Sequence, residues 1–189
     1  MGDSAGPCAV NPTGTRTVIY ILSGSGRMEF VRKGPEDAEE LNGYLHPIWH
    51  EVFDPLMPHE EAEYIFRTWT NPDAIRKAMS DGYEFGYVYD DSRKLGLYSF
   101  HIQDDGRFYV NKLYYEPQYR GRGLGGKALE KMISIARENG CSEVYLNVYY
   151  RNERAFKAYL RAGLTDYYRY SEDIGGGYSR EDYIMSMRL

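Results

Sequence analysis

Apolar residues recur along the chain with two different periods, and the changes of period predict which segments form helices and which form strands. Alternation in "MEFVRKG" predicts a strand that begins at Met28. Pro35 and the two acids after it predict the start of a helix, because proline suits the first helical turn and acids suit its positive end. Apolar residues return at helical spacing over 60–69 and 72–79. From 83 to 115 the alternation indicates three strands joined by Asp-Asp-Ser and Asp-Asp-Gly turns.

The segment 46–58, "HPIWHEVFDPLMP", contains three prolines, and we expect an irregular connection there because proline interrupts helices. His46 and His50 lie within this segment, and His59 follows it. Their spacing matches no standard metal site, and no cysteine accompanies them. We therefore interpret the three histidines as loop or acceptor-pocket residues and expect no bound metal.

The second half of the chain alternates between helical and strand-like patterns. Its expected elements are a helix that ends at Asn139-Gly140, a strand over 143–148, a helix from Asn152 to Gly163, and strands over 165–170 and 183–189 around a Gly-Gly-Gly loop. Together with the first half, this order predicts an α+β fold with a mixed, mainly antiparallel central sheet flanked by helices, which is an α/β/α sandwich.

The length of 189 residues predicts a single domain. Residues 1–27 have few charges and many Gly, Ser, Pro and Thr, so we interpret them as an N-terminal extension that is poorly ordered or adds one strand, and 28–189 as the domain. The apolar run at 18–22 is too short for a signal peptide or a membrane span. Cys8 and Cys141 give no disulfide framework. We expect a cytoplasmic protein that binds neither membrane nor nucleic acid, with a homodimer left open.

Charge is distributed unevenly along a chain whose net charge is -5. The segment 36–91 has fourteen acids against three bases, whereas 112–137 has two acids against six bases. This asymmetry predicts a cationic ligand near the first segment and an anionic ligand near the second. The simpler alternative is that both segments present solvated faces, as charge runs usually do.

The stretch "YRGRGLGGKAL" (119–129) is typical of loops that bind phosphate, and three interpretations compete. A nucleotide P-loop is disfavoured because Ala128 follows Lys127 where that loop needs a hydroxyl for Mg²⁺. A dinucleotide loop is disfavoured because its glycines are offset and hairpin-linked strands precede it. The third interpretation is R-x-x-G-x-G, with Gly123 and Gly125, whose backbone N–H groups would bind the pyrophosphate of coenzyme A without a metal.

A second motif downstream supports the third interpretation. "RNERAFKAYLRAGL" contains N-x-x-A-x-x-x-Y-x-x-x-G-L, which places Asn152 and Tyr159 on one face of a helix. The two motifs together, separated by a helix and a strand, resemble the GNAT superfamily of acetyl-CoA-dependent N-acetyltransferases. The resemblance covers 28–189. The N-terminal half is more loosely similar to bacterial spermidine/spermine-type N-acetyltransferases.

This resemblance implies a set of residues around the coenzyme. The strand before the loop splays from its neighbour and offers backbone groups to the pantetheine arm, the loop amides bind the pyrophosphate, and an asparagine contacts the coenzyme arm. The matching coenzyme-binding residues are Leu113, Tyr114, Tyr115, Arg120, Gly121, Arg122, Gly123, Leu124, Gly125, Gly126 and Asn152.

The resemblance also implies two proton transfers. Tyr159 matches the tyrosine that protonates the departing thiolate. Related enzymes often use a strand glutamate to take the proton of the acceptor ammonium, but Asn111 stands at that position and cannot act as a base. We expect His101, one strand earlier, to replace it, with Glu84 as a further candidate.

The expected function is transfer of an acetyl group from acetyl-CoA to a primary amine by direct attack in a ternary complex. The acidic N-terminal half favours a small cationic acceptor such as a polyamine. A peptide or protein N-terminus and an aminoglycoside stay open as acceptors. The missing glutamate at Asn111 leaves a different class open as well, a coenzyme-A-binding module without catalysis.

Overall fold

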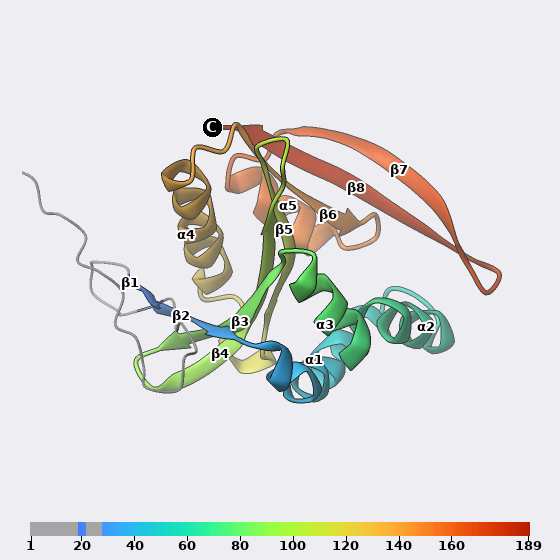
Figure 1. Cartoon of the computed structure of the whole chain (residues 1–189). Helices are drawn as coiled ribbons and strands as arrows, with labels where there is room; N and C mark the ends of the chain where they lie inside the picture. The colour runs from blue at the N-terminus through green and yellow to red at the C-terminus, as the bar shows by residue number, and fades with distance from the viewer. Residues whose placement is uncertain (1–18, 22–27) are drawn as a thin grey trace, which may run out of the picture.

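The computed structural model describes residues 19–21 and 28–189, which form one sheet with helices on both faces (Figure 1). The strands are β1 Ile19–Ile21, β2 Met28–Lys33, β3 Glu84–Asp90, β4 Arg93–Ile102, β5 Arg107–Tyr115, β6 Glu143–Tyr149, β7 Asp166–Gly175 and β8 Tyr178–Arg188. The helices are α1 Ala38–Phe53, α2 His59–Thr70, α3 Pro72–Ser80, α4 Leu124–Glu138 and α5 Glu153–Arg161, with single 3₁₀ turns at Pro35–Asp37 and Pro117–Tyr119.

The eight strands are ordered β1-β2-β3-β4-β5-β6-β8-β7. β5 and β6 run parallel, and the other neighbouring pairs run antiparallel. The predicted mixed, mainly antiparallel sheet is therefore confirmed. Most of the expected N-terminal extension, 1–27, lies outside the described residues, apart from β1, which pairs with β2.

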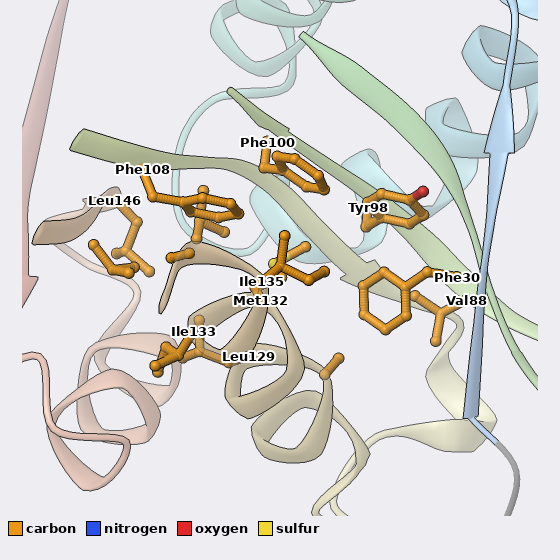
Figure 2. Packing of buried hydrophobic residues seen from close by; sticks show 14 of the residues in the cluster. Phe30, Val88, Tyr98, Phe100, Phe108, Leu129, Met132, Ile133, Ile135 and Leu146 are labelled. Atoms are coloured by element: carbon orange, nitrogen blue, oxygen red, sulfur yellow. The ribbon is translucent and has the colours of Figure 1, made fainter. Parts of the chain in front are cut away.

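Two apolar clusters hold the helices on the two faces of the sheet. One face of the sheet packs against α1, α2 and α3, and the other packs against α4, with α5 at its edge. Figure 2 shows the second cluster, in which α4 turns its apolar stripe toward the strands. The residues labelled there are Phe30, Val88, Tyr98, Phe100, Phe108, Leu129, Met132, Ile133, Ile135 and Leu146. This arrangement confirms the α/β/α sandwich.

The irregular connection expected over 46–58 is wrong in its first half, because α1 continues through Pro47 as far as Phe53. Proline removes one backbone hydrogen bond from a helix interior. Buried residues at helical spacing outweigh that loss, since they attach α1 to the sheet along its whole length. The buried residues of α1 are Ala38, Leu41, Leu45, Ile48, Trp49 and Phe53. His46 and His50 consequently lie on a helix and not in a loop.

The last two strands are longer than the sequence predicted, and together they form a hairpin that extends beyond the helices (Figure 1). The apolar-polar alternation is weak in β7 because most residues on both faces of this strand are exposed. The hairpin turn contacts α2, where the Tyr64 hydroxyl donates to the carbonyl of Ile174 at 2.9 Å. Gly176 in that turn has φ +63, and a Cβ there would lie 2.7 Å from the Tyr64 ring, so the turn requires glycine.

Candidate active site

β5 and β6 separate partway along their length. They pair from Arg107↔Glu143 to Val110↔Leu146, yet β5 continues to Tyr115 and β6 to Tyr149. Beyond Val110 the edge of β5 that faces β6 therefore has no ladder partner in the described chain. The predicted splay of this strand is present, with residues 113–115 beside the gap.

A bulge in β5 changes which side chains face the helices α1–α3. β4 pairs Ser99 with Lys112 and Phe100 with Val110, so Asn111 is an extra residue without a ladder partner on β4. Its amide donates to the Ser99 hydroxyl at 3.2 Å. As a result, Asn111 and Lys112 both line the cavity described below, although neighbouring strand residues normally point to opposite faces.

The glycine loop connects β5 to the N-terminus of α4. Gly121 and Gly123 both have φ +76, and Gly123 is the N-cap of α4. No described hydrogen bond uses the backbone N–H of any residue in 121–126; Lys127 is the first to donate, to the Gly123 carbonyl. A Cβ at Gly121, Gly123, Gly125 or Gly126 would meet no atom within 4 Å. The loop thus presents consecutive unpaired donors around open space, at the positive end of a helix.

The Arg120 side chain faces inward, away from this row of amides. Its Nε donates to the Tyr115 carbonyl at 2.8 Å, and its Nη1 pairs with Glu51 Oε1 on α1 at 3.0 Å. Arg120 therefore fastens the loop to β5 and to α1, and Arg122 is the exposed arginine of the loop. Both arginines were expected among the coenzyme-binding residues, with Arg120 as the arginine of the motif.

Helix α5 carries the second motif on the far side of the gap. Asn152 is its N-cap, with its side chain accepting from the Ala155 N–H at 3.1 Å. Tyr159 is half-buried and packs against the core cluster beneath α4. Burial raises the pKa of Tyr159 to about 12. The pKa of Tyr114 is raised, first by burial and second by its electrostatic interaction with Tyr159. The two phenols are therefore electrostatic neighbours.

A cavity of about 490 Å³ lies between helices α1–α3 and strands β5, β6 and β8. Its helical wall includes Trp49 and Phe53 of α1, whose rings lie 4.0 Å apart, centre to centre. Its strand wall includes Tyr114 and Tyr149, and Tyr149 lies 6.3 Å from the Phe53 ring. Aromatic faces of this kind attract cations and cover apolar chains.

The cavity holds five charged side chains, four of which form two ion pairs. Lys77 and Asp81 pair at 2.6 Å near the exposed rim, and Arg180 and Asp182 of β8 pair at 2.5 Å. Burial raises the pKa of Asp182, against the effect of Arg180. Lys112 is buried, and no described residue accepts a hydrogen bond from its ammonium or forms an ion pair with it. Burial, followed by the charge of Arg180, lowers the pKa of Lys112 to about 8.

Neither of the bases expected from the sequence lines this cavity. The His101 ring stacks on Tyr83 at 4.4 Å, so it lies behind a residue that lines the cavity, and its Nδ1 is buried without a partner in the described chain. Glu84 accepts from the Tyr98 hydroxyl at 2.8 Å, on the opposite, α4-covered face. Burial raises the pKa of Glu84.

Sequence reasoning missed the cavity residues Lys112, Arg180 and Asp182. Arg180 and Asp182 stand at alternate positions of a strand, which puts them on one face. That alternation was a signal in the sequence, but the strand was expected to begin at 183. Lys112 gave no signal, because it lines the cavity as a result of the bulge.

Comparison with known proteins shows to which family the chain belongs. The sequence pattern of the acetyltransferase (GNAT) family matches residues 43–164. The chain belongs to the GNAT acetyltransferase family. The matched part of this GNAT chain runs from α1 through the gap and the glycine loop to the end of α5, so it includes every coenzyme-binding residue expected from the resemblance.

Curated relatives of the GNAT chain match over part of their length. The bovine (Bos taurus) thialysine N-epsilon-acetyltransferase is 38% identical over 73 residues, which is 38% of this chain and 43% of the relative. The spermine/spermidine N(1)-acetyltransferase of Bacillus subtilis is 31% identical over 71 residues, 36% of this chain and 47% of the relative. The chain thus spans less than half the length of each of these relatives.

Solved structures agree with the fold. The PaiA N-acetyltransferase of Thermoplasma acidophilum, in complex with coenzyme A, has a TM-score of 0.66 at 22% identity and covers 86% of this chain and 99% of that one. The spermidine/spermine N-acetyltransferase SpeG of Vibrio cholerae has a TM-score of 0.61 at 14% identity, covering 85% and 93%. Within the described residues, no helix is long and apolar enough to cross a membrane.

Proposed function

We propose that this GNAT protein transfers the acetyl group of acetyl-CoA to a small primary amine by direct attack in a ternary complex. One observation carries the proposal: six consecutive unpaired amides, 121–126, lie beside the gap where β5 leaves β6. The amides suit a pyrophosphate, and the free edge of β5 suits the amide groups of a pantetheine arm. Family membership and the coenzyme-A complex of a structural neighbour support the same ligand.

The residues present fit the coenzyme. Leu113, Tyr114 and Tyr115 would offer backbone groups to the arm, 121–126 would hold the pyrophosphate, and Asn152 would contact the arm with its amide nitrogen, since its oxygen is used in capping. The part proposed for Arg120 is structural, because its side chain holds the loop against β5 and α1. No metal is needed to neutralise the pyrophosphate at a helix N-terminus.

Tyr159 is the proposed acid. A thiol has a pKa of about 8.5, so a tyrosine with a pKa of about 12 keeps its proton at neutral pH. It can donate a hydrogen bond as charge develops on the departing sulfur and complete the transfer in the course of the reaction. Its electrostatic proximity to Tyr114, at the gap, supports this role.

Asp182 is the proposed proton acceptor, in place of His101. It lines the cavity, and burial raises its pKa, which makes it a stronger base than an exposed aspartate. His101 does not line the cavity, and its ring stacks on Tyr83, which does. The pairing of Asp182 with Arg180 limits the rise in its pKa, because the cation favours the ionised form.

The acceptor is proposed from the cavity walls. The acids of 36–91, on which the polyamine prediction depended, contribute Asp81 alone to the lining. Aromatic rings and Asp182 suit an ammonium group, and the unpaired Lys112 suits an anionic group. An amine that carries a carboxylate would satisfy both. Because relatives are named for acetylation of thialysine and of spermine or spermidine, the first acceptors to test are amino acids and polyamines.

A screen of amines with acetyl-CoA, following released thiol, tests the proposal. The panel pairs lysine with cadaverine and ornithine with putrescine, so that each pair differs by a carboxylate, and it adds spermidine, a dipeptide and an aminoglycoside. We expect turnover with at least one small primary amine. Coenzyme A binding without turnover on any amine would contradict the proposal and favour the non-catalytic coenzyme-binding module that Asn111 suggests.

A further inference from the structure

A cluster of three histidines and two carboxylates joins α1 to α2 on the side away from the sheet core. His46 and His50 stand four residues apart on α1, so their side chains share one face of the helix. Their Nε2 atoms lie 3.2 and 2.8 Å from the same atom, Oε2 of Glu63 on α2. Two imidazole nitrogens and one carboxylate oxygen, within 4.8 Å of one another, thus point to a common position.

The groups behind these three atoms hold them in orientation. The other ring nitrogen of His50, Nδ1, lies 2.8 Å from Oδ1 of Asp54, and this contact keeps a proton on Nδ1, so that a metal ion would displace only the proton that Nε2 donates to Glu63. The other oxygen of Glu63, Oε1, pairs with Arg67 Nε at 2.5 Å, which leaves Oε2 for the imidazoles. The His46 ring is fixed by an edge contact with Phe66, 4.9 Å between centres.

We propose that His46, His50 and Glu63 bind a divalent transition-metal ion, of which Zn²⁺ is the best match. Two imidazoles and a carboxylate form a three-ligand set of the kind that binds Zn²⁺ and leaves a fourth position for water. A carboxylate on the second nitrogen of a ligand histidine, as Asp54 on His50, is a recurring companion of zinc sites. The His46-x-x-x-His50 spacing looked unsuitable in a predicted loop, and it becomes suitable on the observed helix.

A neighbouring set of atoms, Nδ1 of His50, a carboxylate oxygen of Asp54 and Nδ1 of His59, is the competing site. It is the weaker choice because its members are more exposed. The side chains of Asp54 and His59 are 38% and 63% exposed, against 24% and 48% for Glu63 and His46, so ordering the first pair costs more entropy. It would also take Nδ1 of His50 away from its orienting hydrogen bond.

The proposed ion would connect two helices that line the cavity from their other faces. Trp49 and Phe53 of α1 and Ile65 and Trp69 of α2 line it. The described contacts between these helices already include a hydrogen bond from the Trp49 indole to the Ala62 carbonyl, 3.0 Å long. A bound ion would add a second link on the solvent side, and the helical wall of the cavity would open less readily.

Titration of the untagged full-length protein with ZnCl₂ in a calorimeter, with a non-thiol reductant present, tests the site. We expect saturable binding of one ion per chain and a higher unfolding temperature with zinc. His46→Ala, whose side chain is 48% exposed and can change without loss of folding, and Glu63→Gln should abolish both effects. Asp54→Asn should weaken binding about tenfold through the second nitrogen of His50.

His59→Ala is the matched control, since it removes a neighbouring histidine that the proposed site does not use. It should leave the zinc affinity within about threefold of the wild-type value, which is less than the loss expected even for an outer-shell partner. Loss of binding in His59→Ala would move the ion to the competing site and overturn the assignment. Binding that survives both His46→Ala and Glu63→Gln, or no saturable binding by the wild type, would overturn it as well.

Discussion

The two sides of the candidate active site are built by different means. The glycine-loop side comprises the gap next to 113–115 and the loop 120–126. It presents mainly backbone groups from one short stretch of the chain. The cavity side consists of side chains from α1, α2, α3, β5, β6 and β8, which are far apart in the sequence. A site made of backbone can be recognised from a local motif, whereas a site made of side chains depends on the whole fold.

The largest expected effect comes from Tyr159, the electrostatic neighbour of Tyr114 at the gap. Tyr159→Phe keeps the packing of the ring and removes the proposed acid, so kcat should fall by at least about 100-fold. Affinity for coenzyme A should not change, since the loop is untouched. Steady-state kinetics and calorimetry on Tyr159→Phe, beside the exposed Tyr168→Phe as control, measure both quantities. A kcat within fivefold of wild type would remove Tyr159 from the mechanism.

The next effect concerns the backbone of the glycine-loop side. Gly123→Ala places a Cβ on a residue with φ +76, which costs about 1–2 kcal/mol and should weaken coenzyme A binding about tenfold. Gly140→Ala imposes the same strain at φ +70 at the other end of α4, where a Cβ also meets no atom within 4 Å. It should lower stability to a similar degree without changing coenzyme affinity. Equal affinity losses in both variants would mean that strain acts through global stability alone.

A smaller effect should separate acceptors on the cavity side. Lys112→Met removes the unpaired cation, so kcat/KM should fall about fivefold for lysine and change little for cadaverine, in line with the loss of one charge-assisted hydrogen bond. Lys127→Met, at an exposed position in the first turn of α4, should change neither. Equal losses for lysine and cadaverine would show that Lys112 does not contact a carboxylate.

The last expected effect is on the pH dependence of stability. The pKa of Lys112 is lowered to about 8 in the folded protein, against about 10.4 when unfolded. Between these values the unfolded chain binds more protons, so the stability of the wild type should rise with pH there, relative to Lys112→Met. Below pH 8 the buried cation is fully charged and the variant should be the more stable protein. Urea denaturation at pH 7 and pH 10 checks the sign of this difference.

The success of sequence reasoning followed the same division. The fold class, the glycine N-terminus of α4 and the cap at Asn152 depend on local patterns, and the splay of β5 was implied by the family resemblance; the structure contains each of them. The roles proposed for the coenzyme-binding residues and for Tyr159 stay predictions. His101 was chosen from its position along a strand, without knowledge that Tyr83 would cover it.

Two departures from the sequence-based predictions had long-range causes. The helix through Pro47 is stabilised by burial against the sheet, which a local proline rule does not contain. The bulge at Asn111, which turns Lys112 into the cavity, is a property of the pairing between β4 and β5. Both errors affected the acceptor region, because that region is where distant segments meet.

The register of β8 decides which of its charged side chains face the cavity. Arg180 and Asp182 face the cavity, and Glu181 between them faces outward, where it pairs with Arg169 of β7. A slip of β8 by one residue against β6, where Asp182 now pairs with Tyr149, would exchange these faces. The ion pair would leave the cavity and a single acid would enter. Because buried Met185 would change faces in the same slip, the charge of the cavity is tied to the packing of the core.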